Sequence, residues 1–399
     1  AMTALARLTH RGAVAADGKT GDGCGLLIKF PDAFMRAVGE ELGFTLNRRF
    51  AAGTVFLSQD ADEAAIAREL IAAAIEETGL EAAGWRAVPT DPSVCGEEAL
   101  KTLPRIEQLY VNAPDGMPRG RFNRRLFLAR RRAEKRMGDG QAYIASLSSA
   151  TISYKGMIMP ASLQDFFPDL KDPRLESSVC VFHQRFSTNT LPQWRLAQPF
   201  RFLAHNGEIN TIQGNRNWAQ ARAKNFISDK LDDISDLDPI ISLVGSDSSS
   251  LDNMLEVMRA GGMDVLQAMR IQLPPAWQAA DHFDPDVRAF YEFFDCQMEP
   301  SDGPAGIVLT DGRYAACCLD RNGLRPARYV VTKDRHITVA SEIGVYDYDE
   351  KDVVSKGRLG PGEMLAVDLV NGVLLENDDI HDILKTRAPY KKWLKQGVR

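Results

Sequence analysis

Two polar stretches that follow apolar runs decide the fold of this chain: HQRFSTNT at residues 183–190 and QPFRFLAHNGEIN at residues 198–210. Both place Arg, Asn, Gln, His and Thr side chains at the ends of expected strands. Buried polar side chains cost free energy unless they are paired. The gathering of so many of them at strand ends indicates a binding or catalytic site.

Arg185 and the Asn206-Gly207 pair are the first candidate site residues. The planar guanidinium of Arg185 suits bidentate capture of a carboxylate, although a structural salt bridge is an open alternative. The Asn206 side-chain amide and the Gly207 backbone N–H could together bind a developing oxyanion. The alternative for Asn-Gly is a hairpin turn, for which this pair is the commonest short signal.

Asp247 is the third candidate, in the stretch GSDSSSLD at residues 245–252. A helix is expected over residues 248–260, and Asp247 and Ser248 are its capping candidates. Alternatively, the Asp247 carboxylate could hold the ammonium group of a ligand. The capping role does not exclude the second role.

The order of expected elements predicts the fold class. Residues 26–88 alternate strand, helix and strand, which suggests an α/β unit. From residue 142 onward, sheets and helices come in blocks, so we expect stacked antiparallel sheets with helices on their outer faces. Residues 121–137 predict a basic helix, interpreted as a solvated or subunit-facing surface rather than a nucleic-acid patch.

The composition excludes several classes of protein. The 399 residues include 48 Lys and Arg against 54 Asp and Glu, a net charge of −6, so nucleic acid is not an expected partner. No apolar run reaches the roughly 18 residues of a membrane-spanning helix, and no membrane partner is expected. The six cysteines lack metal-ligand spacing and are expected to be reduced thiols, so we expect no metal.

The polar stretches at residues 183–190, 198–210 and 245–252 closely resemble the class II glutamine amidotransferase domain of the glutamate synthase large subunit. The same resemblance is found in LARLTHRGAVAADGKTGDGCG at residues 5–25 and in LDRNGLRP at residues 319–326. The resemblance covers nearly the whole chain. It implies an α+β fold of the N-terminal nucleophile hydrolase type, a four-layer αββα sandwich with two stacked antiparallel sheets. It places this domain at residues 1–385 and the start of a linker to an absent synthase region at residues 386–399.

The resemblance also implies glutaminase chemistry, in which an N-terminal cysteine attacks the side-chain amide of L-glutamine. The released ammonia is transferred to 2-oxoglutarate. Asn206 and Gly207 are then the oxyanion hole, and Arg185, with Thr188 nearby, binds the substrate α-carboxylate. Asp247 binds the substrate α-amine.

One departure from the family concerns the nucleophile. The sequence begins at Ala1, inside the helix that follows the nucleophile's strand in the family, so we expect these residues to lack that strand and its cysteine and to be inactive alone. Cys24 is expected to be a small buried residue rather than a substitute nucleophile. The alternatives are a nucleophile-less glutamine-binding or regulatory homologue that docks a synthase, and an amidotransferase of the same fold with another acceptor.

The resemblance implies FMN and an iron–sulfur cluster for the full enzyme, with no cofactor in this chain. The implied partners are L-glutamine, a synthase domain and an electron-donating subunit or ferredoxin. An oligomer is expected, in the cytoplasm, or in a plastid if the source is a plant or an alga.

Overall fold

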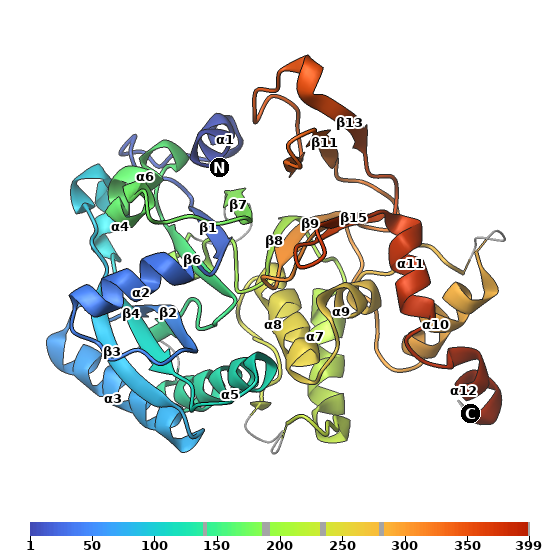
Figure 1. Cartoon of the computed structure of the whole chain (residues 1–399), viewed down its shortest axis with the longest axis horizontal. Helices are drawn as coiled ribbons and strands as arrows, with labels where there is room; N and C mark the ends of the chain where they lie inside the picture. The colour runs from blue at the N-terminus through green and yellow to red at the C-terminus, as the bar shows by residue number, and fades with distance from the viewer. Residues whose placement is uncertain (139–141, 186–191, 232–236, 279–282, 398–399) are drawn as a thin grey trace. The chain divides into compact units, whose positions relative to one another are not determined.

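The computed structural model of the chain describes residues 1–138, 142–185, 192–231, 237–278 and 283–397 (Figure 1). The chain forms two compact units. Unit 1 comprises Ala1–Leu203 and Ile227–Asp238, and unit 2 comprises Ala204–Phe226 and Pro239–Arg399.

Unit 1 contains two antiparallel sheets. The three-stranded sheet has the order β6-β1-β7 and the four-stranded sheet the order β3-β4-β2-β5. The strands are β1 (Cys24–Lys29), β2 (Phe50–Leu57), β3 (Glu81–Ala87), β4 (Arg105–Asn112), β5 (Ala142–Ile144), β6 (Thr151–Gly156) and β7 (Cys180–Gln184). The helices are α1 (Met2–Arg7), α2 (Asp32–Glu41), α3 (Ala61–Glu77), α4 (Glu97–Lys101), α5 (Arg119–Met137) and α6 (Leu163–Phe166).

The strand–helix–strand pattern of residues 26–88 suggests an α/β unit, but the strands are arranged differently in the structure. β2, α3 and β3 do follow one another, but β2 and β3 are not neighbours. β4 lies between them and pairs antiparallel with both. β4 comes later in the sequence and inserts between β2 and β3. Its pairs with both strands are antiparallel, so the parallel arrangement of an α/β unit does not form.

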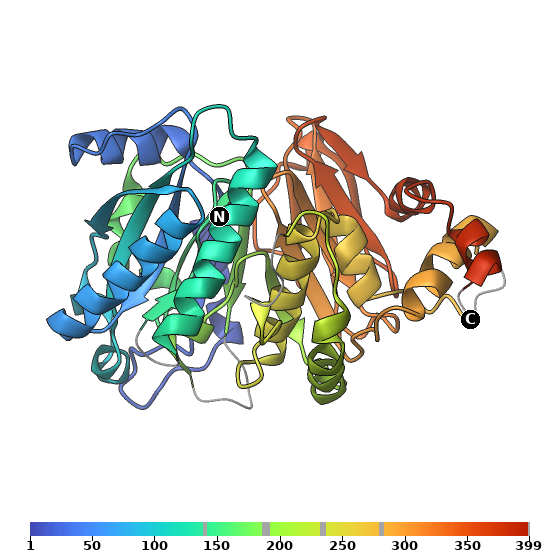
Figure 2. The same cartoon turned by 90° about the horizontal axis from the view of Figure 1, so that it is seen from below.

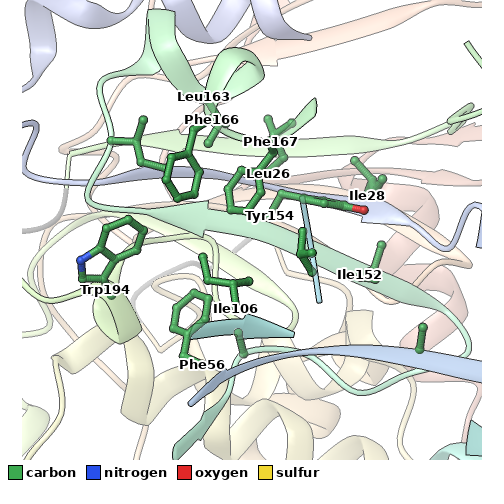
Figure 3. Packing of buried hydrophobic residues seen from close by; sticks show 14 of the residues in the cluster. Leu26, Ile28, Phe56, Ile106, Ile152, Tyr154, Leu163, Phe166, Phe167 and Trp194 are labelled. Carbon is green, nitrogen blue, oxygen red and sulfur yellow. The ribbon is translucent and has the colours of Figure 1, made fainter. Parts of the chain in front are cut away.

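A single hydrophobic core lies between the two sheets of unit 1 (Figure 3). Side chains alternate along a strand, so β2 turns Phe56 toward this core and Val55 to the opposite face. That opposite face packs on α3 and α5, which lie side by side in Figure 2. The labelled core residues are Leu26, Ile28, Phe56, Ile106, Ile152, Tyr154, Leu163, Phe166, Phe167 and Trp194. The predicted α+β class, with stacked antiparallel sheets and an outer helical layer, is confirmed.

Unit 2 also contains two antiparallel sheets. One has the order β15-β14-β10-β9-β8 and the other the order β12-β11-β13. Their strands are β8 (Leu203–Gly207), β9 (Ala305–Thr310), β10 (Tyr314–Leu319), β11 (Arg328–Thr332), β12 (Ile337–Ala340), β13 (Val353–Arg358), β14 (Met364–Asp368) and β15 (Val373–Leu375). The helices are α7 (Ile212–Arg222), α8 (Asp247–Ala260), α9 (Val265–Gln272), α10 (Pro285–Asp295), α11 (Asn377–Lys385) and α12 (Tyr390–Gly397).

The C-terminal residues 386–399, where the start of a linker is expected, include a helix. Residues 390–397 form α12, which packs against α10 through the rings of Tyr390 and Phe290, 5.4 Å apart. Tyr390 is buried. The chain is therefore still helical and packed beyond residue 385. Among the described helices, none is both long and apolar enough to span a bilayer.

Several arginines of the basic helix α5 form ion pairs within unit 1. Glu134 lies among Arg130, Arg131 and Arg201, with N–O distances of 2.6, 3.2 and 3.0 Å. Burial would raise the pKa of Glu134, but these three guanidinium groups outweigh it and hold the pKa at about 2 instead of 4.5. The interpretation of this helix as mainly a solvated or subunit-facing surface is therefore incomplete.

Replacement of Glu134 by glutamine tests this cluster. We expect Glu134→Gln to lower the free energy of unfolding by about 3 kcal/mol at pH 7, because buried guanidinium groups lose their carboxylate. The pKa of Glu134 is depressed in the folded state, so this stabilisation is present above about pH 4.5 and is lost as the pH falls toward 2. Urea unfolding of both proteins at pH 7 and pH 3 measures the difference.

The matched control is Glu77→Gln. Glu77 pairs with Arg136 of α5 at 2.6 Å, but both side chains are more than a third exposed. Exposed pairs contribute less than about 1 kcal/mol. A Glu134→Gln effect as small as that of the control, or one that is unchanged at pH 3, would contradict the assignment.

Candidate functional site

Asn206 and Gly207 end β8, the edge strand of the five-stranded sheet of unit 2. β8 pairs with β9, which begins at Ala305, and residues 208–211 lead into α7. The chain does not return as a hairpin after this pair. The hairpin-turn alternative for Asn206-Gly207 is therefore wrong.

The backbone at Gly207 touches the start of β9. Gly207 has φ +151°, and an added Cβ would lie 1.7 Å from the Pro304 carbonyl oxygen. The next backbone N–H, that of Glu208, donates to the same oxygen at 2.8 Å. Only glycine fits in such a contact without displacing the backbone. The strand end that carries the expected oxyanion donors is therefore held closely against residue 304.

Asp247 reaches from α8 to the turn that follows this strand end. Its Oδ2 accepts the Ile209 N–H at 2.8 Å, and its Oδ1 accepts the Ser248 N–H at 2.7 Å. About 20% of the Asp247 side chain is exposed. Each carboxylate oxygen accepts one hydrogen bond from a backbone N–H and has a further lone pair that could accept one from a ligand.

The helix cap differs from both capping candidates. Ser246 is the N-cap, because its side chain accepts the Ser249 N–H at 3.1 Å, and Asp247 is the first residue of the helix. The prediction that Asp247 or Ser248 caps α8 is therefore wrong. The Asp247 carboxylate is directed to Ile209 instead, which leaves the ammonium-binding interpretation in place.

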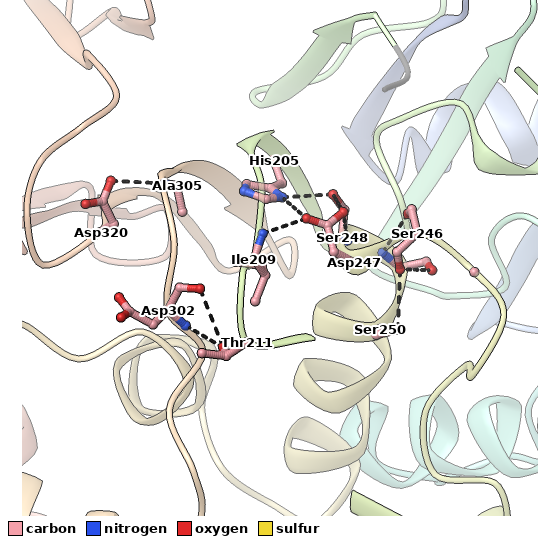
Figure 4. A network of polar contacts seen from close by, with 12 residues as sticks. His205, Ile209, Thr211, Ser246, Asp247, Ser248, Ser250, Asp302, Ala305 and Asp320 are labelled. Carbon is pink, nitrogen blue, oxygen red and sulfur yellow. Dashed lines mark hydrogen bonds and ion pairs between the residues drawn. The ribbon is translucent and has the colours of Figure 1, made fainter. Parts of the chain in front are cut away.

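His205 lies beside the same carboxylate. Its side chain is fully buried, with Nδ1 2.8 Å from Ser248 Oγ and 3.7 Å from Asp247 Oδ2 (Figure 4). Burial lowers the pKa of His205 below 6.5, although the nearby Asp247 carboxylate acts in the opposite direction. The imidazole is therefore neutral at pH 7.

Arg185 directly follows β7 in unit 1. Its φ of +89° puts a non-glycine residue in the left-handed region, and its N–H donates to the Gly23 carbonyl at 3.0 Å. Its Nε lies 3.7 Å from Asp22 Oδ2, and 44% of the side chain is exposed. The ion pair of the structural alternative is thus present, but it is too long to be a hydrogen bond.

The predicted site residues fall into two groups. Within unit 2, Asp247 contacts the turn that follows Asn206 and Gly207, so these three are brought together. Arg185 belongs to unit 1 and is described there by itself. Thr188 lies outside the described residues.

Sequence reasoning missed two polar residues that build this part of unit 2. One is His205, whose only local signal is a polar side chain in an apolar strand. The other is Asp320, which is 1% exposed and accepts the backbone N–H groups of Ala305 and Asn322 at 2.9 and 3.0 Å. The Asp320 carboxylate thereby holds the start of β9 and the loop after β10. The loop sequence DRNG could have indicated this role, because the side chain of an Asp at the start of a turn commonly accepts hydrogen bonds from backbone N–H groups.

Four of the six cysteines are buried, Cys180 is half-buried and Cys296 is exposed. Cys24 is fully buried, and its thiol donates to the Ile158 carbonyl at 3.1 Å. Burial raises the pKa of Cys24, that of Cys180 to about 12 and that of Cys95 to about 11. Burial likewise raises the pKa of Cys317, and that of Cys318 to about 12. Such thiols are protonated at neutral pH, and a protonated thiol is a poor nucleophile.

Comparison with known proteins places the chain in an established class. The family described as glutamine amidotransferases class-II matches residues 1–393, so the chain belongs to this family. Its α+β fold with stacked antiparallel sheets agrees with the N-terminal nucleophile hydrolase type that the resemblance implies.

More particularly, the chain is similar to glutamate synthase large chains. It is 41% identical over 398 residues to the glutamate synthase [NADPH] large chain of Bacillus subtilis (strain 168), covering 99% of this chain and 26% of that one. The large chain of Azospirillum brasilense is 42% identical, covering 98% and 26%. The ferredoxin-dependent glutamate synthase 1 of Arabidopsis thaliana is 39% identical, covering 100% and 25%. The chain thus spans about a quarter of the length of these relatives.

Substitution of Gly207 tests the contact with Pro304. We expect Gly207→Ala to destabilise the protein by about 2–4 kcal/mol, because a Cβ overlaps the Pro304 oxygen and the backbone conformation disfavours a side chain. Thermal unfolding measures the change. The matched control is Gly214→Ala in α7, where nothing lies within 4 Å of the added Cβ. There alanine should stabilise by about 0.5–1 kcal/mol, and a similar gain at position 207 would contradict the contact.

Proposed function

We propose that this chain is the glutaminase domain of a glutamate synthase and binds L-glutamine. The observation that carries the proposal is the contact of Asp247 with the turn after Asn206 and Gly207, in a chain of this family. In the proposed reaction, glutamine is hydrolysed to glutamate and ammonia, and the ammonia is transferred to 2-oxoglutarate.

Each end of glutamine has a proposed partner. Asp247 binds the α-ammonium group, since a fixed, partly buried carboxylate attracts a cation more strongly than an exposed one does. Arg185 binds the α-carboxylate through its guanidinium, with Thr188 nearby. The partial exposure of the Asp247 and Arg185 side chains leaves each accessible to a small ligand.

Asn206 and Gly207 are proposed as the oxyanion hole. When a thiolate attacks the side-chain amide carbon, the carbonyl oxygen gains negative charge. The Asn206 amide and the Gly207 N–H then donate to that oxygen, and fixed donors favour the transition state because they need no reorganisation. Collapse of the intermediate expels ammonia and leaves an acyl-enzyme, which water hydrolyses to glutamate.

The nucleophile is not proposed among residues 1–399. Burial raises the pKa of the buried Cys24 thiol, which already donates to a backbone carbonyl, and the family resemblance assigns the attack to a cysteine at the N-terminus of the mature protein. We therefore propose that residues 1–399 alone bind glutamine without hydrolysing it, and that a cysteine outside these residues attacks in the active enzyme. A nucleophile-less binding or regulatory homologue that docks a synthase is the alternative if no such cysteine exists.

The remaining components are proposed for the longer protein. Within the described residues, no three His, Cys, Asp or Glu side chains gather in a group that could hold a metal ion. As the family resemblance implies, we assign the FMN and the iron–sulfur cluster to other residues of a full enzyme. A synthase region, and an electron-donating subunit or ferredoxin, are its proposed partners, in an oligomer in the cytoplasm or a plastid.

Binding of glutamine and two analogues tests the ligand roles. Asp247→Asn should weaken L-glutamine and 4-aminobutanamide, which lacks the α-carboxylate, by about 10–100-fold, because a charged hydrogen bond is lost. It should leave glutaramic acid, which lacks the α-amine, unchanged. Arg185→Lys should show the opposite preference, because the bidentate fork is lost. Calorimetric titration measures each affinity.

The matched control is Asp302→Asn. Asp302 pairs with Arg321 at 2.6 Å and not with the Asp247 cluster. It should leave all three affinities within about 2-fold of the wild type. Equal losses for both analogues in Asp247→Asn would assign Asp247 to structure alone, and absence of glutamine binding by the wild type would refute the proposed function.

Asn206→Ala tests the oxyanion role in the longer protein that carries the nucleophile. We expect kcat to fall by about 10²–10³-fold with little change in KM, because this donor acts in the transition state. Ammonia release measures turnover, and residues 1–399 alone should release none. A rise in KM with unchanged kcat would instead place Asn206 in ground-state binding.

A further inference from the structure

Arg216, in the second turn of α7, reaches across to the backbone that precedes Asp247. Its Nη2 donates to the carbonyl oxygens of Gly245 and Ser246, at 2.5 and 3.3 Å. A hydrogen bond from a charged donor is stronger than one between neutral groups, and a guanidinium holds several donors in one fixed plane. The two residues that lead into Asp247 are therefore fastened to α7.

A third contact of Arg216 lies on the other side of Asp247, in the first turn of α8. Its Nε donates to Ser250 Oγ at 3.0 Å. The Ser250 hydroxyl proton is given to the Ser242 carbonyl at 2.8 Å, so a lone pair of Oγ accepts from the arginine. Figure 4 shows Ser246, Asp247 and Ser250 at this end of the helix. Arg216 thus contacts the chain both before and after Asp247.

The Asp247 carboxylate is held by the same stretch of chain that carries Arg216. The Ile209 N–H donates to Asp247 Oδ2 at 2.8 Å, and residue 209 lies seven residues before Arg216, in the turn that leads into α7. The segment after Gly207 therefore fixes Asp247 at two points, the side chain and the preceding backbone. A carboxylate that is fixed before the ligand arrives loses less freedom on binding, which favours affinity.

The charge of Arg216 has an effect on ligand binding that opposes this one. Burial lowers the pKa of Arg216, and the Asp247 carboxylate acts in the opposite direction, so the two charges attract each other. The same positive charge repels an ammonium group that binds at Asp247. Removal of Arg216 would therefore strengthen ammonium binding if its charge dominated, and would weaken it if its hydrogen bonds dominated.

We propose that Arg216 is a positioning residue for the Asp247 carboxylate and thereby sets the affinity for the α-ammonium group of the ligand. The inference rests on the proposed function, because it uses the role given there to Asp247. The three hydrogen bonds of Arg216 go to Gly245, Ser246 and Ser250, so it acts on the ligand through Asp247 and not by direct contact.

Two variants of Arg216 and two ligands test the proposal. Arg216→Ala should weaken L-glutamine by about 10-fold and leave glutaramic acid, which lacks the α-amine, within about 2-fold. Arg216→Lys keeps the charge but cannot serve Gly245 and Ser250 together, so it should weaken L-glutamine by about 3-fold. Calorimetric titration measures each affinity. Stronger binding of L-glutamine in Arg216→Ala, or equal losses for the two ligands, would overturn the proposal.

The matched control is Arg222→Ala, on the same helix. Arg222 donates to the Gln297 carbonyl at 2.5 Å and pairs with Glu299, so it joins α7 to residues 297–299 and not to the start of α8. This variant should leave both affinities within about 2-fold of the wild type. A loss of L-glutamine affinity equal to that of Arg216→Ala would assign the effect to a general loosening of α7 and would overturn the proposal.

Hydrogen exchange without ligand judges the positioning role separately from glutamine binding. In Arg216→Ala the Ile209 amide should exchange about 10-fold faster relative to the amides of β10, because Asp247 no longer stays in place to accept its proton. A general loss of stability would accelerate both sets of amides equally, and that result would overturn the proposal. Arg216→Lys gives the same comparison if the alanine variant does not fold. Absence of glutamine binding by the wild type would refute the proposed function instead.

Discussion

The candidate site of unit 2 depends on one close contact, that between the backbone at Gly207 and the Pro304 carbonyl. An added Cβ would lie 1.7 Å from that oxygen, so the end of β8 meets the start of β9 without an intervening side chain. From this contact follow the hydrogen bond of Glu208 to Pro304 and that of Ile209 to Asp247. The proposed oxyanion donors and the Asp247 carboxylate are thus positioned by contacts with backbone atoms.

Local patterns in the sequence were sufficient for part of this arrangement. An apolar run that ends at Asn206-Gly207 predicts a strand end, and a Ser- and Asp-rich stretch before apolar periodicity predicts the start of α8. Both features depend on neighbours in the sequence, so both could be predicted. Antiparallel sheets with helices also followed from the order of the elements. Arg185, Asn206, Gly207 and Asp247 were nominated by these patterns and by the family resemblance, and their ligand roles stay predictions.

The parts that could not be predicted depend on distant residues. β4 lies between β2 and β3, and pairs with both through the backbone, at a position that the local pattern of residues 26–88 does not contain. The cap of α8 moved from Asp247 to Ser246 because the Ile209 N–H attracts the aspartate. His205 meets its partner Ser248 only when α8, which begins 42 residues later, packs beside β8. The packing of α12 depends on the aromatic side chains of α10, which lie about 100 residues earlier in the chain.

The backbone at Arg185 gives an independent physical reason to assign it a ligand. Among the described residues, only Arg185 and Arg335 combine a non-glycine side chain with positive φ. Arg335 lies in the turn between β11 and β12, where such a conformation is common. Arg185 instead follows β7 and is held by the Gly23 carbonyl. Such a conformation costs on the order of 1–3 kcal/mol, and glycine at position 185 would relieve it. Within the described part of the fold, the guanidinium makes only long contacts, 3.7 Å to Asp22 and 3.5 Å to the Arg11 carbonyl, so the strained backbone is consistent with the proposed role of Arg185 in binding a carboxylate.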